Sequence, residues 1–111
     1  MTSAWTELRA ARDAAAGRVA DLRRELQDVI DSASSTTGDD EHDPEGSTIG
    51  FERAQAQSLL DRAVHRLAEL DAALERADAG DYGRCVVCGG SIGAERLEAR
   101  PGTDRCVTCA R

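Results

Sequence analysis

The chain has 111 residues and a formal net charge of −7, which limits it to one small domain with or without an elongated extension. With one Trp, one Tyr, one Phe and one Met, it cannot build a broad globular core from large side chains. Because the chain is acidic and has no basic stripe that could neutralise phosphates, we expect no direct DNA binding. It also has neither a leader pattern nor an apolar run of membrane-spanning length, so we expect a cytoplasmic protein without membrane contact.

The first predicted element is a helix that Thr2 or Ser3 can cap and that runs to about Asp31. Apolar residues recur along it at steps of three and four, which is the spacing of one helix face. These positions are Leu8, Ala11, Ala15, Val19, Leu22, Leu26 and Val29. The pattern predicts a helix that packs through a single narrow apolar face.

A second helix is predicted from about Thr48 to Ala79, with Gly80 as its C-terminal stop. Its apolar face consists of Ala56, Leu60, Ala63, Leu67, Leu70, Leu74 and Ala77. Two helices of matched length joined by one loop favour an antiparallel coiled-coil hairpin over residues 1–80. The fold class is therefore expected to be all-α. We expect a monomer, and a four-helix dimer of two hairpins is the alternative.

The segment 32–47 between the helices is polar and longer than most helix connections. Its acidic residues form a predicted tip, namely Asp39, Asp40, Glu41, Asp43 and Glu45. A length of this kind indicates either a functional or a disordered loop. Composition alone does not separate a functional acidic tip from a solvated turn.

Four cysteines follow the second helix in the pattern C-x2-C-x17-C-x2-C, namely Cys85, Cys88, Cys106 and Cys109. This spacing is typical of one tetrahedral zinc site. Two disulfides are the alternative, and the lack of a secretory leader favours zinc. Four thiolates close the coordination sphere, so we expect one structural Zn²⁺ and no enzyme activity.

Residues 81–111 are predicted to form a four-cysteine zinc-finger module around this site. The segment AERLEA at 94–99 is expected to form one or two helical turns that end before Pro101. Tyr82, Ile92 and Leu97 are the candidates for its small core. Gly89 follows the second ligand, where positive φ lets the backbone curl and direct N–H groups at sulfur.

The hairpin, its acidic loop and the segment DYGRCVVCGGSIGAERLEARPGTDRCVTCA at 81–110 resemble the DksA/TraR family of bacterial zinc-finger regulators. The resemblance covers nearly the whole chain and is most specific in 81–110. It implies a transcription regulator that binds RNA polymerase and inserts its hairpin into the secondary channel, so that the acidic tip, Asp43 first, faces the catalytic centre. A zinc-stabilised coiled-coil adaptor with a different protein partner is the alternative function.

Family members carry an Asp-Pro-x-Asp-x-Ala signature at the tip, of which Asp43 and Pro44 match the first half. Gly46 and Thr48 occupy the second Asp and the Ala positions. This DPEGS tip, with only two residues after Cys109, is expected for a short branch that lacks the C-terminal helix of longer relatives.

The resemblance also implies ppGpp as a candidate ligand, held by basic residues near the base of the coil and the zinc module. The residues that could contact ppGpp or the polymerase in this way are Arg62, Arg96 and Arg100.

Overall fold

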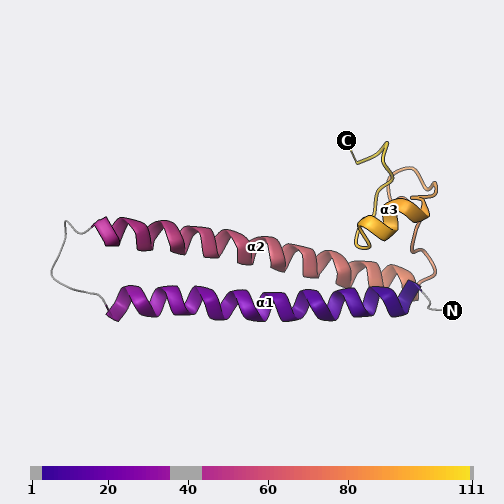
Figure 1. Cartoon of the computed structure of the whole chain (residues 1–111). Coiled ribbons are helices and arrows are strands. Elements are labelled where there is room, and N and C mark those ends of the chain that lie inside the picture. The colour runs from indigo at the N-terminus through magenta and orange to yellow at the C-terminus, as the bar shows by residue number, and fades with distance from the viewer. Residues whose placement is uncertain (1–3, 36–43, 111) are drawn as a thin grey trace. The chain divides into compact units, whose positions relative to one another are not determined.

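The computed structural model describes residues 4–35 and 44–110, with the backbone alone for Ser35 and 44–47. Three helices appear in this part of the chain: α1 (Ala4–Ser35), α2 (Pro44–Asp78) and α3 (Ala94–Ala99) (Figure 1). The other regular pairing among the described residues is one antiparallel bridge between Arg84 and Ser91. The predicted all-α class with a small metal module is confirmed.

Both long helices extend further than their sequence pattern predicts. α1 continues to Ser35 and α2 begins at Pro44, so the predicted loop 32–47 is too long by four residues at each end. These residues are mostly polar or small and contain no large apolar side chain, so apolar periodicity gave no signal for them. Proline suits the first turn of a helix, because the N–H group that it lacks would have no partner there. The capping residues Thr2 and Ser3 and the tip residues 39–43 lie outside the described residues.

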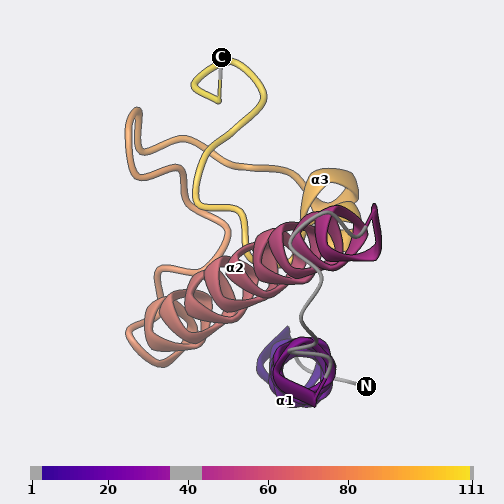
Figure 2. The ribbon, with the colours of Figure 1, turned by 90° about the vertical axis from the view of Figure 1, so that its left-hand side faces the viewer.

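The chain divides into two compact units, and each contains a stretch of both long helices. Unit 1 consists of residues 1–15 and 66–111, and unit 2 consists of residues 16–65. In unit 2 the two helix stretches run antiparallel as one pair (Figure 1), and Figure 2 shows α1 of this pair end-on. Val19, Leu22 and Leu60 are buried there. The division at residue 80 into a hairpin and a zinc-finger module stays a prediction.

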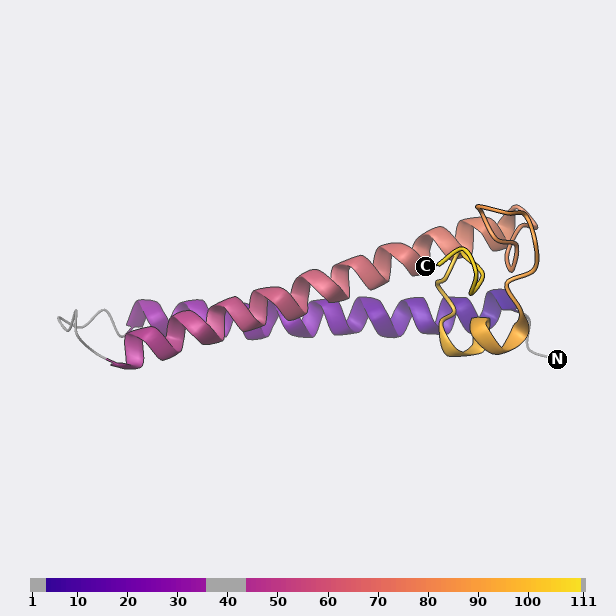
Figure 3. The same cartoon turned by 90° about the horizontal axis from the view of Figure 1, so that it is seen from above.

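Unit 1 has a core in which the first turns of α1 meet the last turns of α2 (Figure 3). Leu8, Ala15, Leu70 and Ala73 are buried in one cluster, with Tyr82 packed against it. All the apolar positions predicted on both helices are buried or half-buried. Ala73 lies outside the predicted stripe yet is fully buried.

One ion pair links the two long helices within unit 1. The Nε atom of Arg12 on α1 lies 2.8 Å from Oδ1 of Asp71 on α2. Both side chains are about a third to half exposed, so water screens the pair and it contributes little to stability. It lies between turns of the two helices that face each other.

α2 ends in a Schellman motif, as the predicted stop at Gly80 requires. The N–H of Gly80 donates to the carbonyl of Ala77 at 3.1 Å, and the N–H of Asp81 donates to that of Arg76 at 2.8 Å. Gly80 has φ of 81°, a left-handed conformation that costs a residue with a Cβ about 1 to 2 kcal/mol. This turn reverses the chain out of α2 and starts the segment that carries the cysteines.

Candidate metal centre

The first cysteine pair is held by a short hairpin of backbone hydrogen bonds. The N–H of Cys85 donates to the carbonyl of Gly90 at 2.7 Å, and the N–H of Gly89 donates back to that of Cys85 at 2.9 Å. Gly89 has φ of 75°. As predicted for this turn, the N–H of Gly90 points at sulfur and lies 3.4 Å from Sγ of Cys88.

The second pair lies on a single turn at the end of the chain. The carbonyl of Cys106 accepts hydrogen bonds from the N–H groups of Cys109, at 3.1 Å, and Ala110, at 3.0 Å. The N–H of Val86, between the first two cysteines, donates to the carbonyl of Asp104 at 2.9 Å. This bond joins the first pair to the segment that leads into the second.

The four sulfur atoms converge on one point. All lie within 4.8 Å of one another, and Sγ of Cys88 is 3.9 Å from Sγ of Cys106. A tetrahedral zinc ion with Zn–S bonds of about 2.3 Å requires sulfur atoms about 3.8 Å apart. All four are free thiols, so the alternative of two disulfides is not what the structure shows. The residues therefore fit one structural, four-coordinate zinc ion.

Before metal binding, the pKa values of the Cys85 and Cys109 thiols are shifted in opposite directions. Backbone hydrogen bonds from Cys106 and Cys88 lower the pKa of Cys85 to about 6. A hydrogen bond with the side chain of Cys106 raises the pKa of Cys109 to about 12. Because zinc binds thiolates, occupation of the site releases the remaining thiol protons, and affinity falls as the pH is lowered.

The predicted small core is present around the first pair. Ile92 is buried at 6% exposure, and Leu97 on α3 is half-buried. Tyr82 donates from its hydroxyl to the carbonyl of Pro101 at 3.0 Å, while its ring packs on the helix core of unit 1. α3 spans Ala94–Ala99, as predicted. The metal module thus shares its packing with the ends of the long helices.

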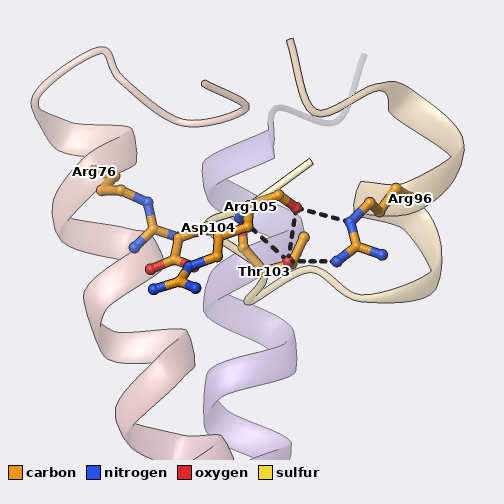
Figure 4. A network of polar contacts seen from close by, with 5 residues as sticks. All are labelled: Arg76, Arg96, Thr103, Asp104 and Arg105. Atoms are coloured by element: carbon orange, nitrogen blue, oxygen red, sulfur yellow. Dashed lines mark hydrogen bonds and ion pairs between the residues drawn. The ribbon is translucent and has the colours of Figure 1, made fainter. Parts of the chain in front are cut away.

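Of the three arginines that sequence reasoning selected, Arg62 lies in unit 2, whereas Arg96 and Arg100 lie in unit 1. Arg62 and Arg100 are exposed, and Arg96 is half-buried. The guanidinium of Arg96 is committed to Arg105 and Thr103, as Figure 4 shows. The predicted role of all three as ppGpp or polymerase contacts stays a prediction.

Sequence reasoning missed Arg76 and Thr103. Arg76 donates from Nη2 to the carbonyl of Thr103 at 3.4 Å, and Thr103 is a hub of side-chain hydrogen bonds (Figure 4). The available signal was the position of Thr103 two residues before Arg105, since a threonine hydroxyl often accepts the N–H two residues on. Nothing in the sequence alone connects Arg76 to this segment.

The helical hairpin and the four converging thiols define a structural zinc-finger protein. Residues 80–111 match the prokaryotic dksA/traR C4-type zinc finger family, so this segment belongs to that family. The resemblance to the DksA/TraR family is thereby confirmed.

Similarity to known proteins extends over both helices and the finger. The chain is 35% identical over 103 residues to the RNA polymerase-binding transcription factor DksA of Caulobacter vibrioides, covering 88% of this chain and 60% of that protein. It is 43% identical over 49 residues to the DksA of Haemophilus influenzae, covering 44% of this chain and 34% of the relative. The chain therefore spans between a third and three fifths of the length of these relatives.

A solved structure shares the fold. The transcription factor DksA2 of Pseudomonas aeruginosa matches with a TM-score of 0.78 and 28% identity, over 96% of this chain and 77% of that chain. No helix in the described part of the chain is long and apolar enough to cross a membrane.

Proposed function

We propose that the protein regulates transcription by binding RNA polymerase directly, as a non-catalytic cytoplasmic factor. The observation that carries this proposal is the likeness to DksA proteins along the long helices as well as the finger. The Caulobacter relative aligns over 88% of the chain, and the Pseudomonas structure superposes on 96% of it. If the zinc finger were attached to an unrelated fold, the similarity to DksA proteins would be confined to residues 80–111.

The surface of the metal module supports a protein partner. Val86, Val87 and Val107, which lie beside the cysteines, are all more than half exposed. Apolar side chains of this kind suit the centre of a protein interface. The net charge of −7 supports a protein partner over DNA, because an acidic surface repels phosphates.

The hairpin is proposed to reach the secondary channel of the polymerase, with its acidic tip near the catalytic centre. Asp43 and the neighbouring acids 39–41 lie outside the described residues, and the backbone of Glu45 lies in the first turn of α2. A carboxylate brought close to a catalytic Mg²⁺ acts through its charge, whereas affinity comes from the larger contact surface. Binding and regulation are therefore expected to be separable.

The first experiment is co-purification of the zinc-loaded chain with bacterial RNA polymerase, followed by transcription with and without the protein. Binding together with a change in transcript yield is expected. Failure of the unmodified protein to bind would contradict the proposal and favour a coiled-coil adaptor for another partner. Addition of ppGpp to the same reactions tests whether the effect depends on it.

The second experiment compares Asp43→Asn with Glu25→Gln, a matched loss of one charge on the exposed surface of α1. Asp43→Asn is expected to reduce the transcriptional effect and leave zinc content, helicity and polymerase affinity unchanged. Glu25→Gln is expected to leave all four unchanged. Full transcriptional effect in Asp43→Asn would remove Asp43 from the proposed role and direct the test to Glu45.

A further inference from the structure

The two cysteine pairs are positioned by different means. The first pair has its own hairpin, closed by Cys85, Gly89 and Gly90 and by the bridge between Arg84 and Ser91. The second pair has a single turn formed after Cys106. Cys106 is therefore placed opposite the first pair through the residues just before it, 103–105, of which Asp104 already accepts the N–H of Val86.

Arg96 on α3 donates two hydrogen bonds to residues 103–105. Its Nε donates to the carbonyl oxygen of Arg105 at 2.8 Å, and its Nη2 donates to Oγ1 of Thr103 at 3.3 Å. The carbonyl of Arg105 belongs to the peptide group that continues into Cys106. Holding that oxygen fixes the plane of this peptide group and therefore the orientation of the Cys106 backbone.

Thr103 completes the arrangement with its own hydroxyl. Oγ1 accepts from the N–H of Arg105 at 3.4 Å and donates to the carbonyl of Arg105 at 3.3 Å. A hydroxyl has one proton to donate and two lone pairs to accept with. With Arg96 as the second donor to Oγ1, the capacity of this hydroxyl is filled (Figure 4).

We propose that Arg96 is a positioning residue for the zinc site, whose guanidinium fork, together with the hydroxyl of Thr103, holds residues 103–105 so that Cys106 is presented to the metal. The role concerns zinc binding and is independent of the proposed action on RNA polymerase. Arg96 acts through the Arg105 carbonyl. It is not a ligand.

The shape of the arginine side chain is essential to this role. Two donors in a fixed plane reach two acceptors on one loop, which a lysine ammonium on a flexible stem cannot reproduce. Without the Arg96 guanidinium, residues 103–105 become ordered only when zinc binds, and the entropy cost of ordering them reduces the affinity of the protein for zinc. Loss of partners that orient metal ligands typically weakens metal binding by about 10 to 100-fold.

The test measures the zinc affinity of the full chain under reducing conditions, by competition with a coloured chelator. Arg96→Gln and Arg96→Lys are both expected to bind zinc about 10 to 100-fold more weakly. The matched control is Arg100→Gln on the same segment. Its side chain is exposed and only its backbone enters the described network. This control is expected to bind zinc like the unmodified protein.

A second pair of variants separates positioning from folding of α3. Thr103→Val removes the hydroxyl and is expected to weaken zinc binding, whereas Thr103→Ser keeps the hydroxyl and is expected to preserve it. The absorption spectrum of the Co²⁺-substituted protein checks that the site stays tetrahedral in the weakened variants. If the Arg96 variants do not fold, the Thr103 pair decides.

Three results would overturn the proposal. Unchanged affinity in Arg96→Lys would show that positive charge is sufficient and that the fork is not needed. Unchanged zinc affinity in Thr103→Val would show that the Thr103 hydroxyl is not needed to position Cys106. Equal losses in Arg96→Gln and Arg100→Gln would indicate a general effect of removing positive charge near the thiolates.

Discussion

Replacing Leu70 by alanine tests whether the helix core of unit 1 also supports the metal module. Leu70 is fully buried among Leu8, Ala15 and Ala73, and its Cδ2 lies 3.5 Å from where a Cβ on Gly102 would stand. At about 0.8 kcal/mol for each of the three carbons removed, with a further cost for the cavity, the free energy of unfolding should fall by roughly 3 kcal/mol. For a domain of this size that lowers the melting temperature by at least about 10 °C.

The assay is urea unfolding of the zinc-loaded protein, followed by far-UV circular dichroism. Arg66→Ala is the control, because Arg66 is exposed one turn earlier on α2, and surface changes stay within about 0.5 kcal/mol. Glu69 does not serve as a control, since its Cβ lies 3.3 Å from where a Cβ on Gly102 would stand. Equal unfolding midpoints for Leu70→Ala and Arg66→Ala would refute the assigned core.

The remaining predictions concern the metal, the half-buried phenol of Tyr82 and two glycines, Gly17 and Gly80. Metal analysis should find one zinc per chain, and Cys85→Ser should abolish it while circular dichroism retains most of the helical signal, because the long helices have their own apolar burial. Burial raises the pKa of Tyr82 above its ordinary 10.0, so the folded state keeps this proton longer than the unfolded state. The free energy of unfolding should not depend on the titration of Tyr82 below pH 10, and it should fall as the pH rises from 10 through the pKa of Tyr82 in the folded state. If Tyr82→Phe loses the same stability at alkaline pH, Tyr82 is not the cause of that loss. Gly80→Ala should destabilise the protein by about 1 kcal/mol because Gly80 has a positive φ. Gly17→Ala should stabilise it by a similar amount, because Gly17 lies inside α1 and a Cβ added there meets nothing within 4 Å. Shifts of the melting temperature in the same direction for the two variants would contradict this reasoning.

The positions that sequence predicted best are those governed by local rules. Gly80 ends α2 because a left-handed residue closes the last turn, and α3 begins at Ala94 and ends at Ala99 as expected. The apolar faces follow from helical spacing. The ends of α1 and α2 next to residues 36–43 were placed wrongly, because residues 32–35 and 44–47, which belong to the two helices, carry no periodic apolar signal.

The sequence by itself determined the four ligands, the metal that suits them and the antiparallel helices. Each of these depends on spacing along the chain and on the chemistry of single residue types. Only the tertiary structure showed that Arg76, Arg96 and Thr103 act on one loop, because those residues are brought together by the turn after α2 and by α3. It likewise decided the burial of Ala73. Contacts between residues distant in sequence depend on how the elements pack, and no local pattern encodes that packing.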